Sequence, residues 1–407
     1  MTVPELEVLP YEAEMTRGAL ASPGPAMGAG DEPPGAQDLD NRHYQDQRTW
    51  VAERGTRILQ MPHTPTPLRE IRLPDALAGL KLYIKDETAH PSQSHKHRLA
   101  EALFLNALVN GWLTSGHPVV EASSGSTAIS EAWFCRELGL PFVAVVPVGT
   151  ADRKKKKITE LGGKVEEVPG PEISSVARKI ARETGGHFMD QFTYAERAYD
   201  WRGKHSLAAE VIGAVDPDWF VMGAGTGGTV TSLARHARFT NRKVKVCVTD
   251  PENSAFFPGW RENNRGATAR GSRIEGIGRP VVEPSFLFPL VNRMIQVPDP
   301  ASIATMRVAA DRLGVRPGAS TGTALFGALK ILHEMHERGE RGTVVTVLCD
   351  PGERYLDTYY DDEWLRQRGI DHTPWLPVIE TFLDNGVWAL PTTWPEPSRP
   401  AAVLWNM

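Results

Sequence analysis

Strand-type and helix-type patterns alternate along the chain from about residue 41 to residue 370. Short, mostly apolar runs predict strands at 82–85, 119–122, 142–146, 164–168, 219–222, 244–249 and 343–348. Apolar residues three and four positions apart predict helices at 97–112, 128–138, 153–161, 174–184, 229–239, 303–313 and 323–338. This alternation is typical of the α/β class, in which helices cover a parallel sheet.

The alternation fails at both ends of the chain. Residues 1–40 are rich in proline and glycine and show no apolar period, which predicts a flexible arm. The tail, residues 371–407, contains many prolines and four tryptophans, Trp375, Trp388, Trp394 and Trp405. Because four exposed indoles would favour association, we expect the tail to pack on the folded body.

Composition excludes several classes of protein. The 407 residues suggest two or three structural units, and a net charge of −5 lacks the basic footprint of a nucleic-acid binder. No run of 18 apolar residues exists, and the first residues lack the apolar segment of a signal peptide. The three cysteines, Cys135, Cys247 and Cys349, are far apart and lack CxxC spacing. We therefore expect no membrane span, disulfide framework or metal site, and a reducing, cytoplasmic setting.

The first loop that could carry chemistry is Ser92–Arg98, between a predicted strand and a helix start. Lys96 is placed near the positive end of a helix dipole and between two histidines, and both features disfavour its protonated form. An amine with a lowered pKa can attack a carbonyl and hold it as a Schiff base. An ordinary solvated lysine at a helix start would show the same local pattern.

Two further loops combine hydroxyl side chains with glycine before a helix. Residues 121–127 contain four serines and threonines around Gly125, a composition that suits a carboxylate at a helix N-terminus. Residues 317–323 contain Ser320, which could hydrogen-bond a ring nitrogen. Helix capping by serine or threonine explains either loop equally well when it is taken alone.

The fourth loop, residues 223–229, has four glycines between a strand and a helix. Such a loop lets backbone N–H groups surround a phosphate. Gly223, Gly225 and Gly228 also match G-x-G-x-x-G, and Asp250 ends the following strand. That combination is the fingerprint of dinucleotide binding, so a nicotinamide-dependent dehydrogenase remains an alternative.

Other patterns favour simpler interpretations. The four lysines at 154–157 are typical of a solvated helix face rather than a docking patch. The twelve histidines show no metal-binding spacing, and Ser124-Gly125-Ser126 lacks the leading glycine of a hydrolase nucleophile elbow.

The four loops together occur in the order seen in fold-type II pyridoxal-phosphate enzymes. The chain resembles the cysteine synthase and cystathionine β-synthase family, with the bacterial L-cysteine desulfhydrase branch looking most similar. The resemblance extends over about residues 41–370. The stretches that carry it are Tyr83–Glu87, Lys96–Ala100, Glu121–Thr127, Met189–Phe192, Tyr194–Arg197 and Ile274–Pro280.

This resemblance implies a role for each loop. Lys96 would hold pyridoxal 5′-phosphate as a Schiff base and serve as the catalytic base. Ser320 would face the pyridine nitrogen, and Ser126 stands where the synthases have an asparagine beside the phenolic oxygen. Residues implied to hold the phosphate are Gly225, Thr226, Gly227, Gly228 and Thr229. Residues implied to bind the substrate carboxylate are Ser123, Ser124, Gly125 and Thr127, with Gln191 nearby. Gln93 replaces a glycine that the family usually has in the lysine loop.

The implied activity is β-elimination on L-cysteine or a related β-substituted alanine. An aminoacrylate intermediate would form on loss of sulfide or another group, and pyruvate and ammonia would follow. A β-replacing synthase with the same site is the main alternative. A catalytically silent member that binds a partner through its arm or tail is another.

The implied architecture is the tryptophan synthase β-like fold, with two α/β domains and the cofactor between them. A large cofactor-binding domain would comprise residues 41–94 and 196–370. A small, mobile substrate-binding domain would comprise residues 95–195. The family expectation is a homodimer that takes a small amino acid as its substrate.

Overall fold

The computed structural model describes residues 42–314 and 316–391. Contacts within the chain divide it into a first unit, residues 1–48, and a second unit, residues 49–407. The arm predicted for residues 1–40 lies outside the described residues. In the described ranges, no helix combines the length and the apolar character needed to cross a membrane.

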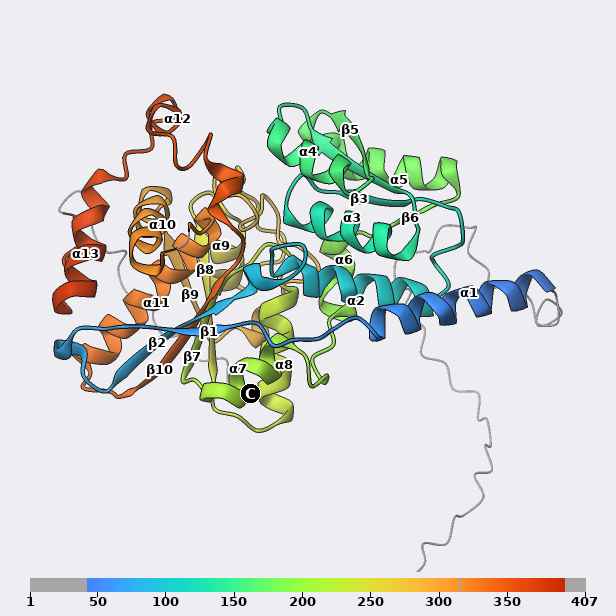
Figure 1. Ribbon diagram of the computed structural model, residues 1–407. Coiled ribbons are helices and arrows are strands. Elements are labelled where there is room, and N and C mark those ends of the chain that lie inside the picture. The colour runs from blue at the N-terminus through green and yellow to red at the C-terminus, as the bar shows by residue number, and fades with distance from the viewer. Residues whose placement is uncertain (1–41, 315, 392–407) are drawn as a thin grey trace, which may run out of the picture. The chain divides into compact units, whose positions relative to one another are not determined.

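A six-stranded sheet is the larger of two sheets in the second unit (Figure 1). Its strands run in the order β1-β2-β10-β7-β8-β9, and all neighbours are parallel except the edge pair β1 and β2. The strand bounds are β1 Leu68–Ile71, β2 Leu80–Asp86, β7 Trp219–Gly223, β8 Lys245–Pro251, β9 Arg293–Val297 and β10 Gly342–Leu348. Alternate side chains enter different cores, since Phe220 and Val221 belong to separate apolar clusters. Burial on both faces explains why these strands read as continuous apolar runs.

The second sheet has four strands, all parallel, in the order β5-β4-β3-β6. Their bounds are β3 Val119–Ala122, β4 Phe142–Pro147, β5 Lys164–Val168 and β6 His187–Phe188. These strands all fall within residues 95–195, the range predicted for a small mobile domain. The domain boundaries and their mobility stay predictions.

Helices cover both faces of each sheet (Figure 1). On the larger sheet, α7, α8 and α9 pack against one face and α10, α11 and α13 against the other. On the smaller sheet, α2 and α3 contribute to one core and α5 to the other. The helix bounds are α1 Arg42–Leu59, α2 Lys96–Val109, α3 Ser126–Leu138, α4 Asp152–Glu160, α5 Ile173–Thr184, α6 Gln191–Ala198, α7 Leu207–Val215, α8 Gly228–Phe239, α9 Phe256–Glu262, α10 Asp299–Leu313, α11 Ala319–Glu337, α12 Asp362–Gln367 and α13 Leu376–Asn385.

The topology determines where chemistry can gather. Strands β2, β10 and β7 are neighbours and parallel, so their carboxyl ends meet at one edge of the sheet. The lysine loop, residues 92–98, follows β2, and the glycine loop, residues 223–229, follows β7. Cys349 and Asp350 follow β10. The carboxyl edge of an open parallel sheet is the usual place for a ligand in α/β proteins.

The α/β class predicted from the sequence is confirmed, and each predicted strand and helix has an observed counterpart. Helices begin earlier than predicted where the first turn is small and polar. Helix α10 starts at Asp299 instead of residue 303, and α11 starts at Ala319 instead of residue 323. Such first turns carry no apolar signal, so periodicity misses them.

The expected packing of the tail is confirmed over its described part. Trp375 is buried in the core of the larger sheet, and Trp388 packs against the same cluster. The ring centroids of Trp388 and Phe326 are 5.2 Å apart. Trp394 and Trp405 lie outside the described residues.

Candidate active site

Lys96 is a buried amine at the start of α2, with 8% of its surface exposed. Its Nζ has no hydrogen bond or ion pair with any described residue. Burial lowers the pKa of Lys96 to about 8, although the Asp350 carboxylate partly offsets this effect. The expected direction is confirmed, and burial is its largest cause. An ordinary solvated lysine is therefore excluded.

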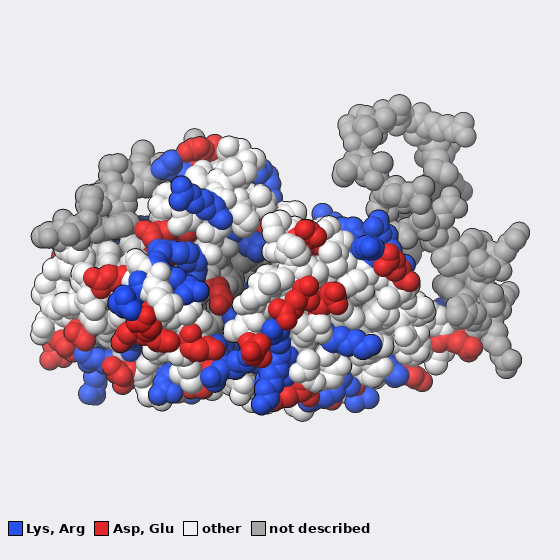
Figure 2. Space-filling model, turned by 90° about the horizontal axis from the view of Figure 1, so that it is seen from above, with Lys and Arg blue, Asp and Glu red and all other residues white. Residues whose placement is uncertain are grey.

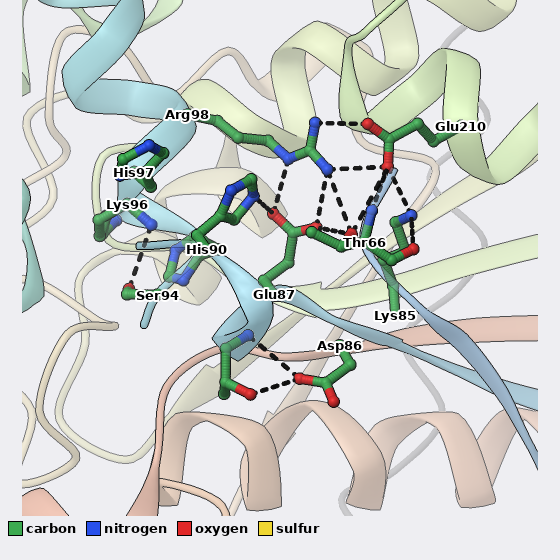
Figure 3. Close-up of polar contacts among 12 residues, drawn as sticks. Thr66, Lys85, Asp86, Glu87, His90, Ser94, Lys96, His97, Arg98 and Glu210 are labelled. Atoms are coloured by element: carbon green, nitrogen blue, oxygen red, sulfur yellow. Dashed lines mark hydrogen bonds and ion pairs between the residues drawn. The ribbon is translucent and has the colours of Figure 1, made fainter. Parts of the chain in front are cut away.

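A buried charge network fixes the first turn of the lysine helix (Figure 3). Arg98 donates from Nε to Glu87 Oε2 at 2.7 Å and from Nη1 to Glu210 Oε1 at 2.8 Å. Lys85 Nζ donates to Glu210 Oε2 at 2.5 Å. Burial alone would raise the pKa of Glu87, but the Arg98 guanidinium holds it well below its usual value. The network ties α2 to β2 and α7, and so fixes the position from which Lys96 extends.

The lysine loop contains a strained residue. Gln93, which replaces the glycine usual in the family, has φ +56°, in the left-handed region that favours glycine. Arg354 Nη2 donates to the carbonyl of Ser92 at 2.8 Å, and the His95 backbone N–H donates to the carbonyl of Cys349 at 3.0 Å. Arg354 and Cys349, which both follow β10 in the chain, therefore hold the lysine loop in this shape.

The glycines of the glycine loop are required by close packing. A Cβ on Gly225 would lie 2.3 Å from the Gly276 carbonyl oxygen and 3.8 Å from Lys96 Nζ. Gly227 has φ +85°, and a Cβ there would lie 2.8 Å from Phe286 Cα. The loop ends at the N-terminus of α8, where backbone N–H groups lack helical partners. Its backbone can therefore approach an anion closely, beside the lysine.

Lys96 and the glycine loop line one hollow. Of the predicted site residues, those lining it are Lys96, Gly225, Thr226, Gly227 and Thr229. Gly228 packs instead against Ala195, 2.9 Å from a Cβ placed on it. His95, Gly223 and Ala224 also line it and belong to the loops singled out from the sequence, without an individual role in holding the cofactor. The lining residues outside those loops are Met222, Val230, Gly276, Ile277 and Cys349.

The loop rich in serine and threonine, residues 121–127, is called the hydroxyl loop. It lies outside the lining of this hollow, at the junction of β3 and α3. Ser123, Ser124 and Gly125 are half-buried. Thr127 Oγ1 donates to Gln191 Oε1 at 2.8 Å, so two predicted substrate-binding residues are in contact. Ser126 Oγ donates to Asp350 Oδ2 at 2.8 Å and accepts from Arg354 Nη1 at 2.6 Å. The loop is thereby joined to the carboxyl end of β10.

Ser320 is buried in the first turn of α11. Its hydroxyl contacts the thiol of Cys349, which lines the hollow. Burial raises the pKa of that thiol to about 12, so it remains protonated at neutral pH. Ser320 therefore does not line the hollow itself, but contacts it through Cys349.

Three residues near the site were missed by the sequence reasoning: Cys349, Asp350 and Arg354. All follow the last predicted strand, whose parallel neighbour leads into the glycine loop. The end of a strand beside a glycine-rich loop was the available signal. Asp350 accepts from Tyr355 Oη at 2.7 Å, and its buried Oδ1 has no hydrogen-bond partner among the described residues.

The solvated interpretation of the lysine run is wrong at Lys154. This side chain is buried, pairs with Glu275, and lies 5.2 Å from the centroid of the Tyr355 ring. Lys156 and Lys157 are exposed, as expected. The contact joins α4, beside the smaller sheet, to the loop that supplies Gly276 to the hollow.

The residues at the hollow fit the cofactor that the resemblance implies. A buried amine without a partner can bond to an aldehyde carbon, and a glycine loop at a helix N-terminus can hold a phosphate. The nicotinamide alternative fits less well, because Asp250 is fully buried away from the hollow. Asp250 Oδ2 accepts from the Phe257 backbone N–H at 2.8 Å, and burial raises its pKa to about 7.

Comparison with known proteins agrees with this geometry. Residues 59–350 match the family described as pyridoxal-phosphate dependent enzyme. The chain is 50% identical over 300 residues to L-cysteine desulfhydrase Cds1 of Mycobacterium tuberculosis, covering 72% of this chain and 82% of the relative. It is 26% identical to cysteine synthase 2 of Schizosaccharomyces pombe, covering 78% of this chain and 86% of the relative.

A solved structure shows the same fold. The crystal structure of O-ureido-L-serine synthase matches with a TM-score of 0.65 and 27% identity, covering 76% of this chain and 98% of that one. These matches exclude the nicotinamide-dependent dehydrogenase as an alternative, and the 50% identity to a desulfhydrase favours an enzyme over a silent binding protein. The chain belongs to the family of pyridoxal-phosphate dependent enzymes, as a member of fold type II.

Proposed function

We propose that the protein is a pyridoxal-phosphate dependent carbon–sulfur lyase. It acts on L-cysteine and releases sulfide, pyruvate and ammonia. The observation that carries this proposal is the 50% identity to an L-cysteine desulfhydrase over most of both chains. The hollow that gathers Lys96 and the glycine loop supports it, because this chemistry needs an amine beside a phosphate site.

Lys96 has two tasks in this proposal. Pyridoxal phosphate, when bound, supplies a sink for the electrons left at the substrate Cα. The Nζ of Lys96 holds the cofactor, and after substrate binding it accepts the proton from the substrate Cα–H. A pKa of about 8 suits both tasks, because a fraction of the amine is free at neutral pH.

The other loops bind and orient. In our proposal, Gly225, Thr226, Gly227, Gly228 and Thr229 bind the phosphate through their N–H groups and hydroxyls. The neutral Ser320 hydroxyl would face the ring nitrogen of the cofactor and would not force its protonation. Ser126 would stand beside the phenolic oxygen, with its hydroxyl oriented by Asp350 and Arg354.

The substrate carboxylate is assigned to the hydroxyl loop. Ser123, Ser124 and Gly125 are half-buried and accessible to a small amino acid. Thr127 and Gln191 form a hydrogen-bonded pair beside them. The groups offered are uncharged donors, which suit a carboxylate that must leave again as part of the product.

Three broader features remain part of the proposal. Residues 95–195 form a small domain that moves on substrate binding, and two copies of the chain form a homodimer. The setting is reducing and cytoplasmic, which the three buried, unpaired cysteines support. On the face of the molecule seen in Figure 2, basic and acidic side chains are interspersed. The proposed substrate is a small amino acid.

Product analysis tests the function. Purified holoenzyme is incubated with L-cysteine, and sulfide and pyruvate are measured with and without a second thiol or amine. Equal amounts of sulfide and pyruvate support the lyase. A new β-substituted alanine in place of pyruvate supports the second candidate, a β-replacing synthase, which the likeness to cysteine synthase 2 and O-ureido-L-serine synthase favours.

Lys96→Ala tests the assignment of the amine. We expect turnover to fall by on the order of 10³-fold, since removal of a general base typically costs 10²–10⁴-fold. Borohydride reduction followed by peptide mass spectrometry should locate the cofactor on Lys96 in the wild type. Lys156→Ala, at an exposed lysine, is the matched control. Labelling of another lysine would contradict the assignment.

A further inference from the structure

Two carboxyl groups are fully buried beneath the hydroxyl loop. Glu121 lies in β3, as the first residue of the hydroxyl loop, and Glu131 lies on α3. Neither residue exposes any surface. Each carboxyl group affects the pKa of the other, and neither oxygen of Glu131 has a hydrogen-bond partner among the described residues. Nothing in the proposed chemistry uses either group.

Glu121 holds two parts of the candidate carboxylate site. Its Oε1 accepts from the Ala122 backbone N–H at 2.7 Å, and its Oε2 accepts from the Gln191 backbone N–H at 3.2 Å. The Gln191 side chain in turn accepts from Thr127 Oγ1. One buried carboxyl group therefore links the start of the hydroxyl loop to the residue that pairs with its end.

The backbone before Gln191 explains why such a link is needed. Asp190 has φ +46°, a left-handed conformation that is costly for a residue other than glycine. Without a bond at the Gln191 N–H, the chain could relax to a commoner conformation and move the Gln191 side chain. Glu121 supplies that bond from the strand that carries the loop.

The surroundings of the pair favour a shared proton. The other titratable groups facing it are Asp190 and Cys135, and neither brings a positive charge. Burial raises the pKa of Glu121 to about 8 and raises the pKa of Glu131 well above its usual value. Two adjacent buried carboxyl groups cannot both ionise, so the pair keeps at least one proton at neutral pH.

We propose that Glu121 is a positioning residue for the substrate carboxylate, acting through Ala122 and Gln191, with Glu131 as its proton-sharing partner. This inference rests on the proposed function, because it assigns the hydroxyl loop and Gln191 to the substrate. Through its shared proton, Glu131 keeps both oxygens of Glu121 directed at the two backbone N–H groups.

A split between KM and kcat tests the proposal in the holoenzyme. Glu121→Gln leaves one oxygen acceptor for two N–H groups, so we expect KM for L-cysteine to rise about tenfold, equivalent to about one hydrogen bond. Glu131→Leu removes the proton donor and should raise KM to a similar extent. Glu131→Gln retains a donor and should stay near the wild type. Glu137→Gln, on the same helix, is the matched control.

Two outcomes would overturn the proposal. One is an unchanged KM in Glu121→Gln and Glu131→Leu while the cofactor absorbance shows holoenzyme. The other is a fall in kcat and in cofactor retention that accompanies the rise in KM, which indicates a merely structural role.

Failure of the proposed function is detected separately, as absence of L-cysteine turnover in the wild type. The same variants are then compared by their dissociation constant for L-serine, read from the change in cofactor absorbance. Binding about tenfold weaker supports the positioning role, and equal binding overturns it.

Discussion

The glycine loop and the hydroxyl loop both connect a strand to a helix, but neighbouring atoms pack closely around the glycines of the first and leave open space beside the glycine of the second. Each follows a parallel strand and begins a helix. A Cβ on Gly225 would collide with the Gly276 carbonyl, and a Cβ on Gly227 would collide with Phe286. A Cβ on Gly125 would meet no atom within 4 Å. Glycine is therefore required by neighbours in the first loop and leaves open space in the second.

In the proposed site, this difference in packing would separate the loop that anchors the cofactor from the loop that binds the substrate. A loop packed tightly from outside has one available shape, which suits a group that stays bound through every turnover. A loop with open space can receive a substrate and release a product. Its position depends on polar contacts instead, through Glu121 below it and Asp350 at its end.

Gly225→Ala should have the largest effect, because it adds an atom 2.3 Å from a backbone carbonyl that cannot rotate away. We expect a loss of about 3 kcal/mol in the free energy of unfolding, the upper part of the range for overpacking. Cofactor retention should fall as well. Urea unfolding and cofactor absorbance measure the two effects. Wild-type stability would show that the loop is less tightly packed than the contacts indicate.

Asp350→Asn should change the pH dependence of cofactor uptake. The Asp350 carboxylate raises the pKa of Lys96 against the larger effect of burial, so its removal moves that pKa further below about 8. Only the unprotonated amine attacks a carbonyl, so uptake of pyridoxal phosphate by apoprotein should rise with pH and level off above the pKa. The rise should come at lower pH in the variant. A pH profile identical to that of the wild type would contradict this coupling, and Asp357→Asn, at an exposed residue, is the control.

Gln93→Gly should stabilise the lysine loop by about 1 kcal/mol. Glycine adopts φ +56° without the penalty of about 1–2 kcal/mol that other residues incur, and the greater freedom of glycine when unfolded removes part of the gain. Thermal unfolding of the holoenzyme measures the change. A lower melting temperature would mean that the Gln93 side chain makes a compensating contact.

Gly125→Ala should have the smallest effect on stability, below about 0.5 kcal/mol, as at an unhindered surface position. The cofactor should remain bound, while KM for L-cysteine rises because the added methyl group occupies space assigned to the substrate. Steady-state kinetics beside the Gly225→Ala variant show whether the two loops differ as the packing indicates. Loss of cofactor from Gly125→Ala would remove the distinction.

Sequence alone predicted the parts of the fold that carry strong apolar patterns. Strands β3 and β5 have the predicted bounds, while α1 and α13 were missed because their apolar positions are few or lie among prolines. Helix α13 has Pro377 in its first turn and a left-handed Gly386 at its end, which are start and stop signals that periodicity ignores.

The candidate site was predicted where local composition reveals it. Glycine-rich loops are visible in a sequence, and the structure brings Lys96 and the glycine loop together in one hollow. The burial of Lys154 and the pairing of Glu131 with Glu121 depend on contacts between distant segments. No local pattern marks a charged residue that will be buried, so these residues could not be found from sequence.

The tail packing sets the length of the smallest fragment worth expressing. Helix α13 and Trp388 cover apolar side chains of α10 and α11, including Phe326. The family match ends at residue 350, well before these segments. A fragment cut to the limits of that match would expose Phe326 and its neighbours and would tend to aggregate. Expression of the catalytic body alone should therefore extend at least through Leu390, which packs against the same core.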